Sequence, residues 1–294
     1  MHKYLRAAGF SDLNKRADFD SLVQKIAVEA DSRAYTSLND DTMIAVFSKE
    51  FAPGVGITVC GEFNENNQFF YEYAYPYVKS NLISSYESIS VERHAAKESY
   101  AGVYDDSKIG VTIIFYLQNI IPYIRAKNTG QLPIKGTSVM LSALSVQGTI
   151  VMPLAKNAHK KAKAVKAGNE RTKLIEAARQ GDEEALESLT LDDMDTYTAI
   201  SKKIQKEDVF TIVDTSFMPY GVECDQYAIL GEITSVDTVT NTLTGEQLYK
   251  LQMECNGIVL ELCINSKDLY GEPRIGRRFK GYIWLQGYIN YPTE

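Results

Sequence analysis

The 294-residue chain lacks the short motifs that identify the common enzyme classes. It contains no Walker A loop, no G-x-G-x-x-G dinucleotide loop and no G-x-S-x-G nucleophile elbow. The three histidines, His2, His94 and His159, are too widely spaced to form a zinc motif, and the four cysteines form no C-x-x-C pair. The sequence therefore names no catalytic residue and no metal ligand, and we expect no cofactor.

Long apolar runs and a secretory signal are also missing. No run approaches the ~20 residues that span a bilayer, and the N-terminal sequence MHKYLRAAGFSDLNKR has neither an apolar core nor a cleavage site. We therefore expect a cytoplasmic protein without membrane contact. In that compartment Cys60, Cys224, Cys255 and Cys263 should be reduced, and most of them should be buried.

An excess of positive charge is missing as well. Lys and Arg number 31 and Asp and Glu number 38, which gives a formal net charge of -7. Because contacts with phosphates need a basic face, nucleic acid is an unlikely partner, although a local basic patch remains compatible with this total. A protein partner or a small-molecule ligand fits the composition better.

The character of the sequence changes twice along the chain. The pattern predicts an α+β domain over 1–155, a helical connector over 156–221 and a C-terminal β domain over 222–294. In the first domain, apolar spacing predicts a helix within 10–31 that packs against a mainly antiparallel sheet. Strands of that sheet are expected at 43–47, 56–63, 69–78, 88–93, 101–104 and 109–117. Pro122 should break the pattern that follows, and 137–144 and 148–152 fit either strands or a short buried helix.

The connector carries two blocks of opposite charge. Residues 156–173 are basic and 182–195 are acidic, so the simplest interpretation is mutual neutralisation; RNA, an acidic partner or a membrane surface are the alternatives for the basic block. Thr190 and Asp193 resemble a capping box, which predicts a helix from about Leu191 to Gln205. This cap also accounts for the acidic cluster Asp192, Asp193 and Asp195 without a metal.

The C-terminal stretch shows the clearest alternation in the chain. Strands are expected at 227–236, 247–254, 258–265 and 279–289, with Asn256-Gly257 as a type I′ hairpin turn. Gly281 and Gly287 suggest a bulge or strong coiling in the last strand, and 266–269 suggests one helical turn. Four coiled strands with a helical turn before the last resemble an OB-like small barrel that lacks one strand of the usual five.

Two groups of residues are candidate ligand-binding surfaces. Tyr71, Tyr73, Tyr75 and Tyr77 alternate in FFYEYAYPYV, so one regular strand would place them on one face as an aromatic platform. Ordinary cross-strand packing beneath the N-terminal helix explains the same pattern. The second group is a basic turn beside an aromatic strand, formed by Arg274, Arg277, Arg278, Lys280 and Trp284.

Three functions remain open from these residues. The first is a non-catalytic binding or interaction protein, because the chain offers aromatic β surfaces and no catalytic motif. The second is an enzyme acting on a small polar substrate at an interdomain cleft, with Glu223, Asp225 and nearby tyrosines as candidates. The third is single-stranded nucleic-acid binding on the OB-like face through the basic turn, with Tyr282 or Trp284.

Three segments together resemble a known family. They are the start MHKYLRAAGFSDL, the block LTLDDMDTYTAISKKIQKEDVFTIVDTSFMPYGVECDQYAILGEI and the ending GRRFKGYIWLQGYI. They are similar to a family of uncharacterised bacterial proteins, a domain of unknown function found mainly in anaerobic Gram-positive species. The resemblance covers nearly the whole chain and implies a cytoplasmic α+β protein, and it carries over no site residues.

Overall fold

The computed structural model describes residues 2–38, 42–64, 66, 68–93, 99–106, 109–133, 136–153, 173–175, 177–204 and 213–291, with side chains of α4 up to 194. The helical elements are η1 Lys3–Ala8, α1 Arg16–Glu29, α2 Ile120–Asn128, α4 Glu183–Ile204 and η2 Ser266–Asp268. The first strands are β1 Ser32–Ser37, β2 Met43–Ala52, β3 Val55–Phe63, β4 Phe69–Val78, β5 Ser90–Arg93, β6 Tyr100–Asp106, β7 Val111–Leu117 and β8 Ser138–Val151. The later strands are β9 Ser216–Pro219, β10 Gln226–Thr240, β11 Gln247–Cys255, β12 Ile258–Asn265, β13 Leu269–Tyr270 and β14 Arg278–Asn290.

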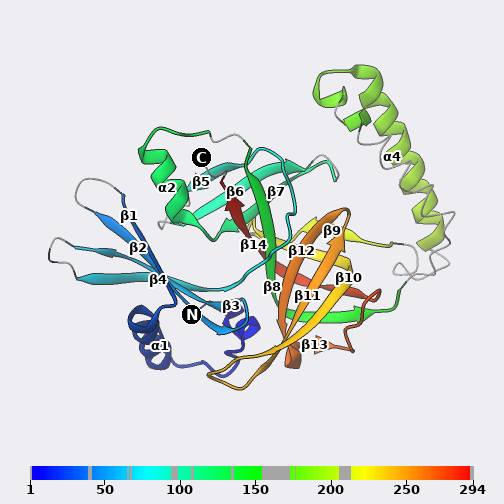
Figure 1. Cartoon of the computed structure of the whole chain (residues 1–294). Coiled ribbons are helices and arrows are strands. Elements are labelled where there is room, and N and C mark those ends of the chain that lie inside the picture. Colours follow the sequence, from blue (N-terminus) through cyan, green and yellow to red (C-terminus); the bar gives the residue numbers. More distant parts are fainter. Residues whose placement is uncertain are drawn as a thin grey trace.

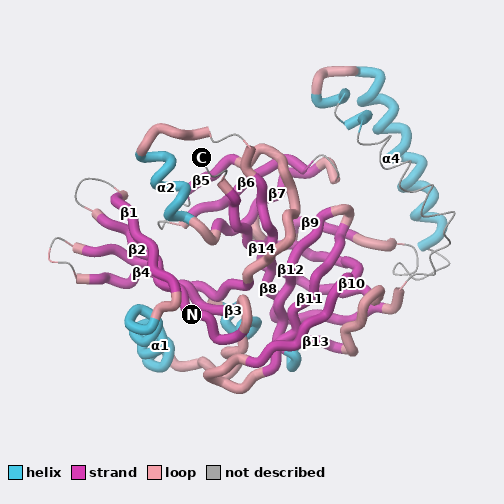
Figure 2. Tube along the Cα trace, in the orientation of Figure 1, coloured by secondary structure: helices cyan, strands magenta, loops and turns pink. Residues whose placement is uncertain are grey.

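Most of these elements belong to two sheets (Figures 1 and 2). A four-stranded antiparallel sheet has the order β1-β2-β3-β4, and a ten-stranded sheet has the order β13-β8-β12-β11-β10-β14-β7-β6-β5, with β9 beside β10. As predicted, α1 packs against its sheet, where it contacts β2 and β3 and buries Phe19, Leu22, Val23 and Ile26. In Figure 1, α4 extends away from both sheets.

Part of the larger sheet closes on itself. β8 pairs with β12 and also with β14, so that β8, β12, β11, β10 and β14 form a ring of five strands. The ring crosses the boundary predicted at residue 155, because β8 comes from the first predicted domain. A register shift between Gly281 and Ile283 confirms the bulge expected in β14. A Cβ at Gly148 would lie 2.2 Å from the ring of Phe279, so glycine is needed where this side chain crosses β8.

The C-terminal hairpin follows its sequence closely. Asn256 and Gly257 have φ of 52° and 82°, as a type I′ turn requires. Leu251, Met253 and Cys255 are buried, whereas Glu254 is exposed, which confirms the predicted alternation. The helical turn before β14 is η2, and its N-cap is Asn265, whose side chain accepts a hydrogen bond from the Lys267 N–H.

Several predicted elements were wrong in the first part of the chain. The strands from 88 to 117 belong to the ten-stranded sheet and are not in the sheet of β2–β4. For 137–144 and 148–152, by contrast, the strand alternative is confirmed, and the two predicted strands are one continuous strand, β8. Pro122 does not interrupt regular structure but lies in the first turn of α2, where backbone N–H groups have no partner within the helix.

The helix α4 also begins earlier than its sequence signal suggested. It starts at Glu183, and Asp182 accepts hydrogen bonds from the N–H groups of Glu184 and Ala185. Thr190 lies inside the helix, and its hydroxyl donates to the Leu186 carbonyl four residues earlier. The predicted start near Leu191 is therefore wrong. The basic block lies outside the described residues except for Lys173.

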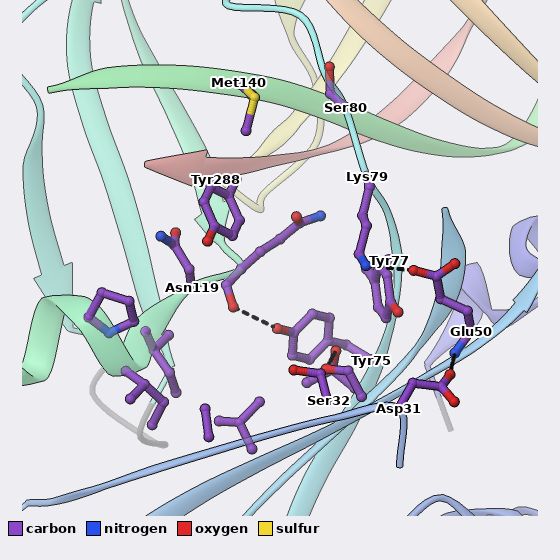
Figure 3. Close-up of a pocket in the computed structure, with 18 of the residues that line it drawn as sticks. Asp31, Ser32, Glu50, Tyr75, Tyr77, Lys79, Ser80, Asn119, Met140 and Tyr288 are labelled. Atoms are coloured by element: carbon purple, nitrogen blue, oxygen red, sulfur yellow. Dashed lines mark hydrogen bonds and ion pairs between the residues drawn. The ribbon is translucent and has the colours of Figure 1, made fainter. Parts of the chain in front are cut away.

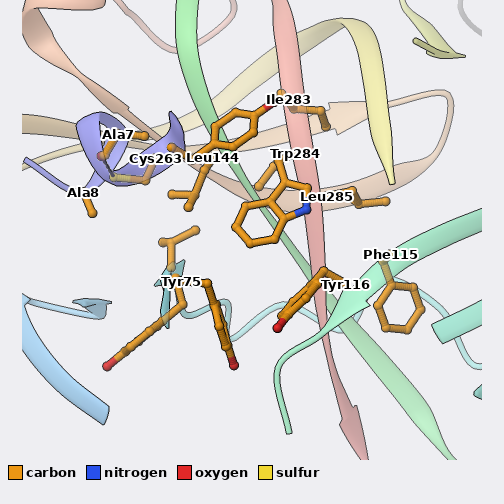
Figure 4. Packing of buried hydrophobic residues seen from close by; sticks show 14 of the residues in the cluster. Ala7, Ala8, Tyr75, Phe115, Tyr116, Leu144, Cys263, Ile283, Trp284 and Leu285 are labelled. Atoms are coloured by element: carbon orange, nitrogen blue, oxygen red, sulfur yellow. Dashed lines mark hydrogen bonds between the residues drawn. The ribbon is translucent and has the colours of Figure 1, made fainter. Parts of the chain in front are cut away.

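The hydrophobic core is continuous through η1, both sheets and α2, and Trp284 lies where these parts meet (Figure 4). Its ring centroid is 5.5 Å from that of Tyr4, 5.1 Å from that of Tyr116 and 6.3 Å from that of Tyr75. The indole N–H donates to Asp225 Oδ2 at 2.7 Å. One side chain thus joins the N-terminal segment, the four-stranded sheet and the ring.

Two glutamines, the half-buried Gln118 and the buried Gln286, hold the edge of β4 against the larger sheet. Gln118 Nε2 donates to the Val78 carbonyl at 3.1 Å and to Gln286 Oε1 at 2.8 Å. Gln286 Nε2 donates to the Pro76 carbonyl at 2.8 Å. Among the described strands, β4 is the last of its sheet, and the two side chains satisfy the Pro76 and Val78 carbonyls on its outer edge.

This amide pair gives a first prediction. Gln286→Met keeps the length of the side chain, so it removes hydrogen bonds with little change in volume. It leaves the Pro76 carbonyl and the Gln118 amide without these partners, and the free energy of unfolding should fall by at least about 2 kcal/mol. Urea unfolding measures the change. Gln147→Met, at an exposed position of β8, is the control, and equal stability of the two variants would contradict the role of the pair.

Candidate functional site

A cavity of about 440 Å³ lies between the four-stranded sheet and the larger sheet (Figure 3). One face of the four-stranded sheet forms its floor. The start of α2 and the side chains of Met140 and Tyr288, from β8 and β14, form the opposite wall. The volume falls within the ~300–1,000 Å³ that is typical of small-molecule sites.

The register of three strands explains why the floor is polar. Ser32 pairs with Ser48, and Ser48 pairs with Thr58, so these three residues point to the same face. Their neighbours on that face are Ala34, Val46, Glu50, Tyr75 and Tyr77, all of which line the cavity. Ser48 and Thr58 hydroxyls lie 2.9 Å apart. The floor therefore offers a row of hydroxyl groups with an apolar patch beside it.

Three charged residues form one rim of the cavity. Lys79 Nζ lies 2.5 Å from Glu50 Oε1, and the backbone N–H of Glu50 donates to Asp31 Oδ2 at 2.7 Å. Burial acts to raise the pKa of Glu50, but the hydrogen bonds from Lys79 and from the Gly54 N–H outweigh it and hold the pKa below its ordinary value. Glu50 is thus an anion at neutral pH.

Two tyrosine hydroxyls line the same floor. Tyr75 Oη donates to the Gln118 carbonyl at 3.2 Å, and Tyr77 Oη lies so close to Gly56 that a Cβ there would be 2.7 Å from it. Burial raises the pKa of both tyrosines, and for Tyr77 the carboxylates of Glu50 and Asp31 raise it further. Both side chains are therefore neutral and keep their O–H groups at neutral pH.

The wall formed by α2 combines apolar side chains with a helix start. Ile120, Ile121 and Pro122 line the cavity. The N-cap residue Asn119 does not cap the helix, because its side chain bonds the backbone of Ile289, with distances of 2.8 Å and 3.0 Å. Asn119 therefore fixes the end of β14 against the wall of the cavity.

The tyrosines of β4 do not form the regular platform considered from sequence. Cys60 pairs with Tyr73, and its neighbour Gly61 pairs with Tyr71, so Glu72 is an extra residue in β4. This bulge puts Tyr71 on the face opposite to Tyr73, Tyr75 and Tyr77. Tyr71 is half-buried near Arg16 and Asp20 of α1, whereas Tyr73 and Tyr75 are buried. Of the four, Tyr75 and Tyr77 line the cavity.

The basic turn also differs from its predicted arrangement. Arg278 is 3% exposed, and its guanidinium donates to the carbonyls of Met152 and Val213. Arg274 pairs with Glu272 at 2.6 Å, and Arg277 donates to the Glu272 carbonyl. Lys280 is exposed on β14.

Trp284 does not accompany the basic turn on the surface. It is 4% exposed and packs 6.3 Å from Tyr75, measured between ring centroids. The fold thus brings together two candidates from different sequence groups, Tyr75 and Trp284. It does not place Arg278 and Trp284 along an open basic groove.

The acidic residues suggested for an enzyme lie outside the cavity. Asp225 holds the indole of Trp284, and its neighbour Cys224 is exposed. Burial raises the pKa of Cys224, and Asp225 and Glu223 raise it further. Cys60, Cys255 and Cys263 are buried thiols, as predicted. Within the described residues, no group of three or more His, Cys, Asp or Glu could hold a metal ion, and no helix is long and apolar enough to cross a membrane.

Sequence reasoning missed most residues of the cavity. Ser48 and Glu50 alternate in β2, and Thr58 lies between two apolar residues of β3, so these polar positions were the available signal. Lys79 and Asn119 gave no such signal, because each lies just after the end of a strand and only the packing of the two sheets brings them together.

The charged rim gives a second prediction. Because the folded-state pKa of Glu50 is depressed, its contribution to stability is present above the unfolded pKa of ~4.3 and is lost as pH falls through the folded value. Glu50→Gln should therefore lose less stability than the wild type between about pH 5 and pH 3. Lys79→Met removes the same pair from the other side and should also weaken the pH dependence. Urea unfolding curves at several pH values in this range measure the free energy of unfolding. If this free energy changes with pH in both variants as it does in the wild type, the pairing of Glu50 with Lys79 is contradicted.

Comparisons with known proteins are consistent with the resemblance seen in the sequence. Searches of the curated proteins and of the solved structures find no match. The family described as a domain of unknown function from E. rectale, DUF3881, matches residues 5–287. Because the match spans nearly the whole chain, this protein belongs to the DUF3881 family.

Proposed function

We propose that this protein is a non-catalytic cytoplasmic binding protein that takes a small polar molecule into the cavity between its two sheets. The observation that carries the proposal is the floor of this cavity, where hydroxyl groups of Ser32, Ser48 and Thr58 lie on one sheet face. Aligned hydroxyls suit a ligand with several hydrogen-bonding groups. The apolar wall at α2 suits one apolar face of that ligand.

The protonation states of the lining favour binding over proton transfer. A general acid or base works best when its pKa lies near the operating pH. The pKa of Glu50 is lowered, and the pKa values of Tyr75 and Tyr77 are raised, so all three move away from neutrality. Groups with a fixed charge or a fixed proton recognise a ligand well, which supports a binding role over the alternative of an enzyme using the same cleft.

The burial of the predicted basic surface bears on the nucleic-acid alternative. Arg278 already bonds backbone carbonyls, and Trp284 lies in the core, so neither side chain supports a groove for single strands. The net charge of -7 points the same way. We therefore do not extend the proposal to nucleic acid.

We also infer that the ring of five strands is an OB-like barrel. Three features support this inference: the hairpin-linked strands β10, β11 and β12, the turn η2 before β14, and closure by a fifth strand. The fifth strand is β8, which comes before the other four in the chain. A fold of this kind does not by itself fix a function, so the proposal rests on the cavity.

A ligand screen tests the proposed function. A thermal-shift screen with a library of small polar metabolites should give at least one hit, and a ligand at 100 times its Kd should raise the melting temperature by about 5 °C. Ala34→Phe, on the cavity floor, should abolish the shift because the ring fills the site. Ser37→Phe, on the opposite face of β1, is the matched control and should keep it. The absence of any hit, or an equal shift in both variants, would count against the proposal.

A further inference from the structure

The floor of the cavity between the two sheets changes character along β1. Ala34 pairs with Val46, and the preceding residue on the same face of β1, Ser32, pairs with Ser48. Asp31 comes immediately before this strand and also lines the cavity. Ala34 and Asp31 are three residues apart in the chain, which is about 10 Å in an extended strand. The floor therefore passes from apolar side chains through hydroxyl groups to a carboxylate within the length of one small molecule.

The helix α2 and the charged residues lie on opposite sides of the cavity. Figure 3 shows Asn119, at the start of α2, on one side and the pair of Glu50 and Lys79 on the other. The first residues of α2 are apolar and line the cavity: Ile120, Ile121 and Pro122. A ligand that places an apolar group against α2 therefore has its other end at the charged rim.

The charged rim carries one more negative group than positive groups. Among the described residues that line the cavity, the charged side chains are Asp31, Glu50 and Lys79. Lys79 Nζ is already 2.5 Å from Glu50 Oε1, so the charges of these two residues cancel. Within the described part of the chain, Asp31 forms no ion pair, and the one hydrogen bond of its carboxylate comes from the backbone N–H of Glu50. The exposed carboxylate of Asp31 is thus left without a counter-ion.

Lys79 shows how this rim accommodates an ammonium group. Its Nζ contacts the carboxylate of Glu50 and lies 5.9 Å from the ring centroid of Tyr77. A carboxylate beside an aromatic ring is a favourable environment for an organic cation. Asp31 offers the same surroundings, because its carboxylate binds the Glu50 backbone and lies close enough to Tyr77 to raise the pKa of that tyrosine.

We propose that the ligand of this cavity is a small amphipathic amino alcohol. Its ammonium group pairs with Asp31, its hydroxyl group bonds the hydroxyl groups of the floor, and its apolar end packs against α2. This inference rests on the proposed function and deepens it by naming the class of ligand. An anionic ligand would add a third negative charge to the rim, and a ligand with its own carboxylate beside the ammonium would have to separate Lys79 from Glu50.

Two probes of nearly the same shape test the proposal on the full chain. 2-Amino-1-phenylethanol carries an ammonium group at neutral pH, and 1-phenyl-1,2-ethanediol has a hydroxyl group in its place. Ligand-observed NMR at low ionic strength measures their dissociation constants. The wild type should bind the amine about three- to fivefold more tightly than the diol, which is within the range of an ion pair at an exposed rim. This preference should disappear in about 1 M NaCl, where the Debye length is only about 3 Å.

Matched variants locate the effect. Asp31→Asn removes the charge but keeps an oxygen that can accept the Glu50 N–H, and this variant should bind the two probes equally. Asp20→Asn makes the same change in net charge on α1, near Tyr71 at the other face of the sheet, and it should keep the wild-type preference. Ala34→Phe should weaken the binding of both probes, because the added ring fills the cavity.

Three results would overturn the proposal. They are equal binding of the two probes to the wild type, a preference for the amine that persists in Asp31→Asn, and a preference that salt does not reduce. The first and third need only the wild type, so they decide even if Asp31→Asn is unstable.

The ligand screen separates this proposal from the proposed function. If neither probe binds but the screen gives hits that Ala34→Phe abolishes, the amino alcohol is wrong and the binding function stands. If neither probe binds and the screen gives no hit, both are wrong.

Discussion

The arrangement of the two sheets depends on how the outer edge of β4 is satisfied. A buried strand edge must find hydrogen-bond partners for its carbonyls, and a neighbouring strand is the usual solution. Here Gln118 and Gln286 supply side-chain amides in place of a strand. A paired strand would have continued one sheet into the other. Two amides join the sheets at one place and let them diverge beside it, and the cavity occupies that space.

The same junction explains the unusual burial of the aromatic residues. The chain has one tryptophan, and it lies where η1, β4, β7 and the ring meet. Asp225 accepts a hydrogen bond from the indole N–H of Trp284 and so orients this side chain. A carboxylate that looks available in the sequence therefore already has a structural role. The tyrosines of β4 divide between the core and the cavity for a similar reason. Whether a tyrosine of β4 could contact a ligand therefore depends on its position relative to the contact between the two sheets.

Local signals in the sequence predicted local structure well. The Asn256-Gly257 turn and the alternation of β11 depend on backbone geometry and on one buried face, and both are visible in a few residues. The alternation of tyrosines in β4 failed as a guide because one extra residue, Glu72, reverses the faces, and its effect depends on the partner strand β3. The cavity was beyond such reasoning, since Lys79 and Asn119 approach it from segments whose contact is set only by tertiary packing.

The place of β8 in the ring has a consequence for how the chain is made. Its partners β12 and β14 are far later in the sequence, so closing the ring requires contacts of high sequence separation. Such contacts are slow to form, because closing a long loop lowers the entropy of the chain before the contacts can stabilise it. During synthesis, β8 leaves the ribosome well before its partners, so one of its edges stays unpaired until β12 is made and the other until β14 is made. Nascent chains of this protein should therefore need protection from association until nearly their full length has been translated.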